Sequence, residues 1–98
     1  MEELRPGERI WSVATGNVNP FIRKSRKAVE YIKGLDGLRG VHPSGRGTLW
    51  FFTSKAAAVR ARNLMMGKGI KCGRSVCGFT VAADGVPEMD GLTGNDEG

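Results

Sequence analysis

The side chains best suited to chemistry are two cysteines, Cys72 and Cys77, and a single histidine, His42. A zinc site uses about four such ligands, so these scattered residues predict no metal centre. A lone histidine also offers no nucleophile–base arrangement, and no glycine-rich phosphate loop with its lysine follows a strand. We therefore expect a protein that is not an enzyme, needs no cofactor, and keeps both cysteines reduced.

Positive charge is concentrated in the body of the chain. All 15 lysines and arginines lie between Arg5 and Arg74, and the net charge is +5. Only three acids fall within residues 4–83, whereas the last residues are acidic. A compact body with this excess repels itself, which predicts an anionic partner such as nucleic acid or an acidic protein surface. The three acids are Glu8, Glu30 and Asp36.

The order of predicted elements is strand, helix, strand, strand, helix, strand. This order predicts an α+β, ferredoxin-like βαββαβ fold, a four-stranded antiparallel sheet with two helices on one face and the first and third strands at its centre. We expect an N-terminal arm (1–7), one domain (8–83) and an acidic, disordered tail (84–98). Periodicity and capping place strands over 8–16, 38–42, 48–53 and 74–83, and helices over 20–35 and 55–66. Ser54 is the expected cap of the second helix, whose inner face is expected to consist of Ala57, Ala58, Ala61, Leu64 and Met65.

No apolar run approaches the ~20 residues that span a bilayer. The first residues, MEELRPGERI, do not have the pattern of a signal or transit peptide. We therefore expect a cytoplasmic protein with no membrane partner.

The stretch GRGTLWFFTS is apolar on both faces of the expected third strand. In one arrangement Leu49 and Phe51 point at the helices, and Trp50 and Phe52 line the bare face together with Trp11. In the other, the tryptophans are core residues, and Leu49 and Phe51 face outward. Both arrangements leave an apolar patch on the open sheet, which is typical of a binding surface or of a homodimer interface.

Basic side chains on the expected first helix break a local electrostatic rule. Arg23, Lys24, Arg26 and Lys27 lie in its first half, where the positive end of the helix dipole disfavours cations. Glu30 is the only nearby acid, which indicates that the charges serve binding. Further cations, Arg9, Arg46 and Arg74, fall near strand ends and turns. The candidate binding residues are Trp11, Trp50, Phe52, Arg9, Arg46, Arg74, Arg23, Lys24, Arg26 and Lys27.

With the tryptophans on the bare face, the chain resembles an RNA recognition motif domain. RGTLWFFT supplies Arg46, Gly47 and Trp50 at the basic, glycine and aromatic positions of that family's third-strand motif, and IWSVAT places Trp11 at its first-strand aromatic position. Thr48, Leu49 and Thr53 depart from the motif. The resemblance implies that unstacked bases lie on the two tryptophans.

A second resemblance is to the phosphate-binding loop of acylphosphatases. GNVNPFIRKS has Gly16, Val18 and Arg23 in similar order, but the catalytic asparagine expected near the end of the second strand is absent and His42 stands there. No group is left to position an attacking water, so the prediction of a non-enzyme stands.

These observations predict a small basic module that binds RNA or single-stranded DNA. The alternative is an inhibitor or adaptor that binds a protein or a nucleoprotein complex. In size and charge the chain is similar to phage- or mobile-element-encoded inhibitors, such as anti-CRISPR proteins that mask the nucleic-acid site of a nuclease complex.

Overall fold

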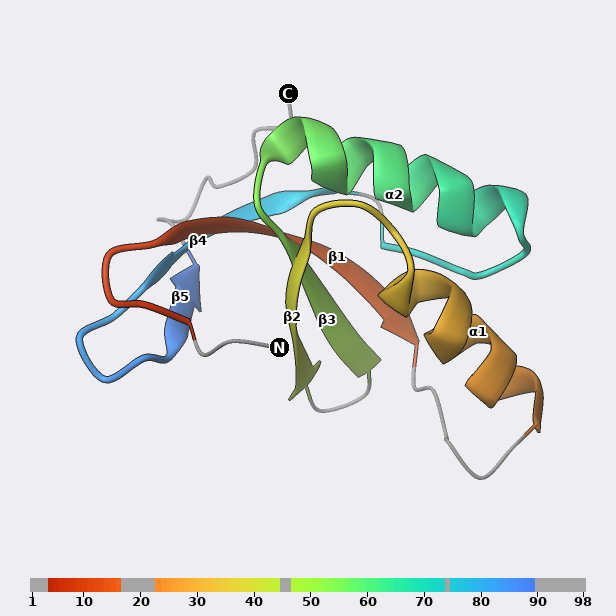
Figure 1. The fold of residues 1–98 in the computed structure, drawn as a ribbon, viewed down its shortest axis with the longest axis horizontal. Helices are drawn as coiled ribbons and strands as arrows, with labels where there is room; N and C mark the ends of the chain where they lie inside the picture. The colour runs from red at the N-terminus through yellow and green to blue at the C-terminus, as the bar shows by residue number, and fades with distance from the viewer. Residues whose placement is uncertain (1–3, 17–22, 45–46, 74, 90–98) are drawn as a thin grey trace.

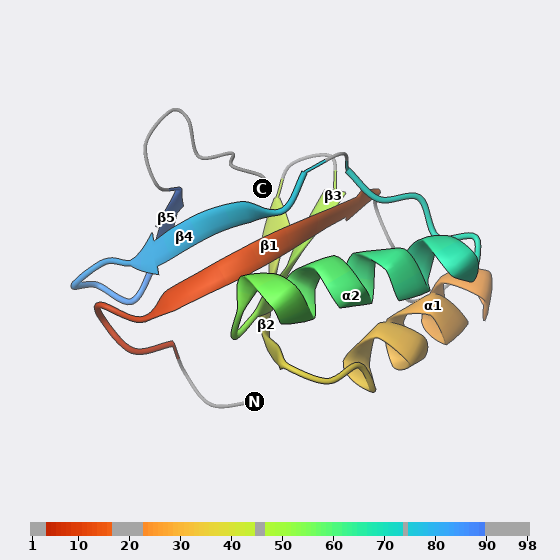
Figure 2. The same cartoon turned by 90° about the horizontal axis from the view of Figure 1, so that it is seen from above.

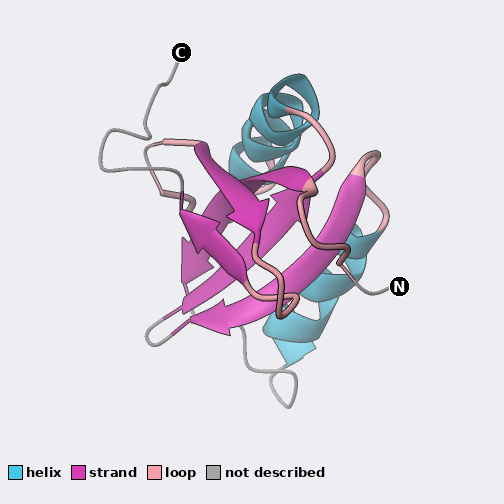
Figure 3. Ribbon diagram, turned by 90° about the vertical axis from the view of Figure 1, so that its left-hand side faces the viewer, coloured by secondary structure: helices cyan, strands magenta, loops and turns pink. Residues whose placement is uncertain are grey.

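The computed structural model describes residues 4–16, 23–44, 47–73 and 75–89 of the chain (Figure 1). Five strands form one open antiparallel sheet in the order β2-β3-β1-β4-β5, and both helices lie on the same side of this curved sheet (Figure 3). In chain order the elements are β1 (Arg9–Gly16), α1 (Arg23–Lys33), β2 (Leu38–Ser44), β3 (Gly47–Phe52), α2 (Lys55–Gly67), β4 (Cys77–Val81) and β5 (Pro87–Met89).

The first six elements follow the predicted order, and β1 and β3 pair at the centre of the sheet as expected. The sheet has five strands rather than four, because a hairpin adds β5 to β4. Gly85 takes a φ of 85° in the hairpin turn, and Asp84 Oδ1 accepts a hydrogen bond from the Val86 backbone N–H at 3.1 Å. This strand lies within residues 84–98, which the sequence assigned to a disordered tail.

The helix-covered face of the sheet carries the tryptophans. Val13, Trp50 and Phe52 pack in one buried cluster with residues of both helices. Trp50 is 2% exposed, and its indole N–H donates a hydrogen bond to Thr15 Oγ1 at 2.9 Å. The arrangement with tryptophans on a bare face is therefore wrong, and the alternative with core tryptophans is confirmed. Both faces of β3 are apolar, so its sequence alone does not show which face points at the helices.

The second face of the sheet is not bare. Phe51 is 1% exposed and meets Phe79 edge to face, with ring centroids 5.1 Å apart. Ile10 and Val81 are also buried in this cluster, and Leu4 of the N-terminal segment packs against it. The prediction of a bare apolar patch at the centre of this face is therefore wrong, because these side chains are buried within the chain. The possible homodimer stays a prediction.

The N-terminal segment (residues 4–8) is fixed at the edge of this second cluster. The Gly7 backbone N–H donates to the Val81 carbonyl at 2.7 Å, and the Val81 N–H donates to the Glu8 carbonyl at 2.9 Å. The Glu8 carboxylate also accepts two hydrogen bonds from the Arg39 guanidinium of β2, at 2.6 and 3.0 Å. The segment predicted as a separate arm is thus tied to strands near both edges of the sheet.

Both helices bury side chains against the sheet, and α2 has a capped start. α2 begins after Ser54, whose side chain accepts a hydrogen bond from the Ala57 N–H at 3.0 Å, so the predicted cap is confirmed. Its predicted inner face is also confirmed at Ala58, Ala61 and Met65, which are buried, but Leu64 is 45% exposed. In α1, Ile32 is buried against the sheet.

The described part of α1 begins at Arg23, and the predicted start at residue 20 lies outside the described residues. Among the described residues, no helix is both long and apolar enough to cross a bilayer.

Candidate nucleic-acid interface

The outer side of the helix layer carries exposed cations. Arg26, Lys27 and Lys33 are exposed on α1. Arg60 is exposed on α2, and Lys68 and Lys71 are exposed in the turn that follows it. Figures 1 and 2 place the beginning of α1 and the end of α2 at the same end of this layer. We call these six residues the helix-layer cations: Arg26, Lys27, Lys33, Arg60, Lys68 and Lys71.

The helix-layer cations are not neutralised by the acids near them. Glu30 is one turn from Arg26 on α1, yet within the described parts of the chain neither forms an ion pair. The first turns of α1 and α2 contain no acid at all. The N-terminal end of the α1 dipole therefore carries a positive potential, and the basic side chains in the first half of the helix add to it. The dipole and these side chains both favour an anion.

One helix-layer cation also joins the two helices. The Lys68 ammonium lies over the Tyr31 ring of α1, 5.3 Å from its centroid. The lysine stem covers apolar surface while the charged end stays exposed, so this contact orders the ammonium without neutralising it. By contrast, Arg62 is half-buried and donates from Nε to the Gly73 carbonyl at 2.9 Å, which fixes it as a structural residue.

Arg9 and Trp11 form a pair at the other end of β1. The Arg9 guanidinium lies over the Trp11 ring at 5.1 Å from the centroid. Trp11 is half-buried on the helix-covered face, and its partner across the β1–β4 pair is Gly78, which has no side chain. Figure 2 shows β4 on the far side of β1 from α2. Two of the candidate binding residues, Arg9 and Trp11, thus lie together, and the arginine packs on one face of the indole ring.

The remaining predicted site residues divide into two groups. Trp50 and Phe52 are buried beneath the helices, so they offer no surface to a partner. The prediction that they contact a ligand directly is wrong, because their strand presents them to the core. The second group has four members, whose side chains are not described. Arg23 and Lys24 are the first two residues of α1, and Arg46 and Arg74 lie outside the described residues.

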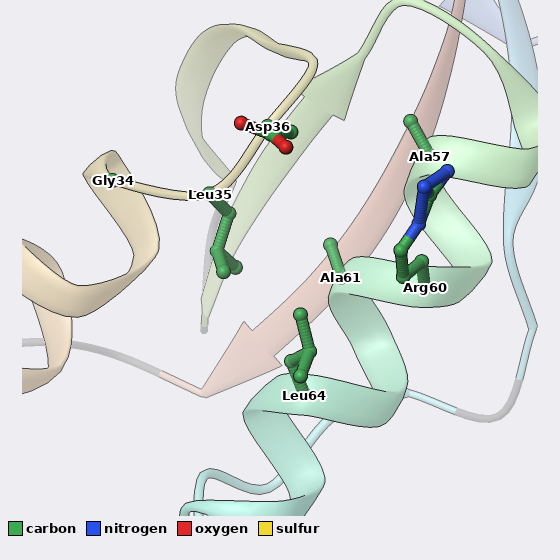
Figure 4. A pocket seen from close by; sticks show the side chains of 7 residues that line it. All are labelled: Gly34, Leu35, Asp36, Ala57, Arg60, Ala61 and Leu64. Carbon is green, nitrogen blue, oxygen red and sulfur yellow. The ribbon is translucent and has the colours of Figure 1, made fainter.

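A hollow of about 160 Å³ lies between α2 and the loop that joins α1 to β2. Its walls are apolar, and Figure 4 shows Leu35 and Leu64 pointing into the space from opposite elements. Asp36 on the loop and Arg60 on α2 lie on opposite sides of it (Figure 4). The residues that line the hollow are Gly34, Leu35, Asp36, Ala57, Arg60, Ala61 and Leu64.

Sequence reasoning missed this hollow, and it did not single out Arg60 and Lys68 as candidate binding residues. The hollow forms only when the loop packs against α2, and no local pattern encodes that contact. The excess of positive charge between Arg5 and Arg74 includes Arg60 and Lys68, but it indicates the body of the chain as a whole and not these two side chains.

The acid at the N-terminal segment is held as a carboxylate. The Arg5 backbone N–H, which donates to it at 3.0 Å, and the Arg39 guanidinium lower the pKa of Glu8 against the opposing effect of burial. Glu8 is therefore ionised at neutral pH, and it is committed to a structural ion pair.

Neither cysteine forms a disulfide. Burial raises the pKa of the Cys72 thiol, although nearby Arg62 acts in the opposite direction, so the thiol stays protonated near neutral pH. No group of three or more metal-ligating side chains occurs in the part of the chain that the structure describes.

Comparisons with known proteins give no relative from which a role could be transferred. A scan against protein-family models found no match, and searches of curated proteins and of solved structures found none either.

Proposed function

We propose that this chain is a non-enzymatic module that binds RNA or single-stranded DNA through the helix-layer cations. The observation that carries the proposal is the state of those six side chains: all are exposed, and none forms an ion pair with a described acid. Neutralising phosphates releases the counterions condensed on the nucleic acid, and this release supplies much of the binding free energy.

The mode of contact follows from the core position of Trp50. Without an exposed aromatic pair on the sheet, binding depends on phosphates rather than on bases stacked across two strands. A flexible strand can follow cations that are distributed over two helices and a turn, whereas a duplex presents its phosphates at fixed spacing. The Arg9–Trp11 pair offers one further aromatic contact at the end of β1.

We also propose that the first four strands and both helices form a ferredoxin-like unit to which β5 is added. The sheet order of these strands, β2-β3-β1-β4, and the split strand–helix–strand connections support this assignment. In this unit the helices cover one face, so their outer side is a continuous surface for a ligand.

The proposal is tested by measuring the affinity of a fluorescently labelled oligo-dT across a salt series. Six phosphate contacts predict that the logarithm of affinity falls with the logarithm of salt concentration with a slope of about −4, since each contact on a single strand contributes roughly −0.7. The variants Arg26→Ala and Lys27→Ala should each weaken binding and reduce the steepness of the slope by roughly 0.7.

The control is Arg5→Ala, which removes an exposed cation from the N-terminal segment instead of the helix layer. It should leave the slope unchanged. Equal losses in all three variants would show that net charge, and not the helix layer, accounts for binding. Absence of binding at low salt would refute the proposal.

Apolar side chains on the outer part of α2 favour a second candidate, an inhibitor or adaptor that binds a protein. Val59 and Met66 are 39% and 49% exposed on this helix. Exposed apolar residues rimmed by polar ones mark protein-binding surfaces. In the assay above, this candidate predicts no binding of oligo-dT at any salt concentration.

A further inference from the structure

The hollow beside α2 contains an acid on an otherwise cationic part of the surface. Asp36 is the only acid between Glu30 and Asp84 in the sequence. Arg60 of α2 also lines the hollow, yet within the described chain neither the Asp36 nor the Arg60 side chain forms an ion pair or a hydrogen bond. A carboxylate only accepts hydrogen bonds and repels phosphate, so the ligand group that meets Asp36 must be a donor.

The walls of the hollow select a flat apolar body. Ala57 and Ala61 present only methyl groups on the α2 side, and Leu35 and Leu64 point into the space from opposite elements (Figure 4). Leu64 is 45% exposed, so the hollow opens to solvent. Its volume of about 160 Å³ is several times that of one water and well below the roughly 300–1,000 Å³ of pockets for whole ligands. This volume suits one ring system, and the sugar and phosphate of a nucleotide would lie outside the hollow.

The loop that carries Asp36 is held in place. Gly37 has a φ of +84°, and a Cβ there would lie 2.8 Å from the Ala57 Cβ, so the loop approaches α2 more closely than other residues allow. The Thr53 N–H donates to the Gly37 carbonyl at 2.9 Å. The hollow is thus preformed, which lowers the entropic cost of binding.

We propose that this hollow binds one guanine base of the strand that the helix-layer cations bind. This proposal rests on the proposed function. Asp36 accepts hydrogen bonds from N1–H and the 2-amino group, which are adjacent donors on guanine. Arg60 donates to O6 and N7, the acceptor pair that arginine commonly recognises. Adenine, cytosine and uracil each place an acceptor beside their donor, and this acceptor would face the carboxylate.

Charge favours a base over the side chain of a protein partner. An arginine or lysine would satisfy Asp36, but Arg60 lines the hollow and the exposed Lys33 directly precedes its lining residue Gly34, so both cations repel a second one. A nucleotide brings both the donor edge for Asp36 and the phosphate for these cations. Unpaired strands expose the Watson–Crick edge that this recognition requires.

The test compares labelled oligo-dT strands that carry one central guanine, adenine or inosine. The guanine strand should bind roughly 5- to 150-fold more tightly than the adenine strand, the range expected for a good bidentate contact. Inosine lacks the 2-amino group and should fall between them. Asp36→Asn should abolish the preference, and Arg60→Lys should weaken it although the charge is retained.

The matched control is Glu88→Gln, which removes a negative charge from exposed β5 and should leave the preference intact. Equal affinity for the guanine, adenine and inosine strands would overturn the guanine site while leaving the proposed function standing. Failure of every strand to bind at low salt would overturn both. In an NMR titration with the wild-type chain, GMP should shift the Asp36 and Arg60 signals. Shifts produced by N-acetylarginine amide and not by GMP would assign the hollow to a protein side chain instead.

Discussion

The two faces of the sheet are both apolar, but the chain covers them in different ways. The helix-covered face buries Trp50 and Phe52 beneath α1 and α2, as an ordinary two-layer domain does. The second face buries Phe51 and Phe79 against each other, with the N-terminal segment at the edge of the cluster. Apolar residues on both faces of a central strand can therefore be buried within one chain. The helix layer carries the six exposed cations on which the proposed binding depends.

The largest expected effect on stability comes from removing the Phe51 side chain, which tests whether the second face is as well packed as the helix-covered face. If the second face is a true core, Phe51→Ala should lower the free energy of unfolding by about 3–5 kcal/mol, and Phe52→Ala should have an effect of the same size on the other face. Denaturant titration of the two variants measures this directly. A loss below 1 kcal/mol for Phe51→Ala alone would mean that the second face is open in solution.

The next effect concerns the contact of the N-terminal segment. Leu4 is half-buried against the second cluster, so Leu4→Ala should lower the free energy of unfolding by roughly 1–2 kcal/mol. Leu64→Ala is the matched control, since Leu64 is 45% exposed and should cost less. Equal losses in the two variants would show that the segment does not stabilise the second face.

A smaller effect should come from the ion pair that fixes the same segment. The Arg5 N–H and the Arg39 guanidinium lower the pKa of Glu8. The stabilisation is therefore complete above the ordinary glutamate pKa of about 4.3, and it is lost as the pH falls through the lowered value. Glu8→Gln should cost up to about 1 kcal/mol at pH 7 and should remove this part of the acid-induced decline. Thermal melting between pH 2 and 7 compares the two chains, and parallel curves would contradict the role of Glu8.

The smallest expected change in the free energy of unfolding is a stabilisation, in contrast to the three variants above. Arg26→Ala relieves a cation near the positive end of the α1 dipole, so it should stabilise the fold by roughly 0.3–1 kcal/mol while weakening nucleic-acid binding. Thermal melting and oligo-dT affinity measured on the same preparation test this opposition. A variant that loses stability as well as affinity would indicate that the cation supports the fold.

The sequence predicted the elements better than their contacts. The Ser54 cap and the buried positions Ala58, Ala61 and Met65 of α2 followed from capping and periodicity. The central position of β1 and β3 followed from the order of the elements. The side-chain direction of Trp50 did not, because both parities of β3 are equally apolar. Strand β5 was missed because it has only three residues, including a proline that sheets accept at an edge.

The candidate site divides along the same lines. The cations of α1 were predicted from local sequence because they lie on one helix and conflict with its dipole. The hollow was not predicted, since Asp36 and Arg60 line the same space only because the α1–β2 loop packs on α2.

The most direct test of the account is an NMR map of the backbone amides during titration with oligo-dT. Binding through the helix layer predicts that the amide signals of Arg26, Lys27 and Arg60 shift, while those of Ala14 and Leu49 on the second face do not. Shifts confined to Ala14 and Leu49 would contradict it and would return the binding surface to the sheet.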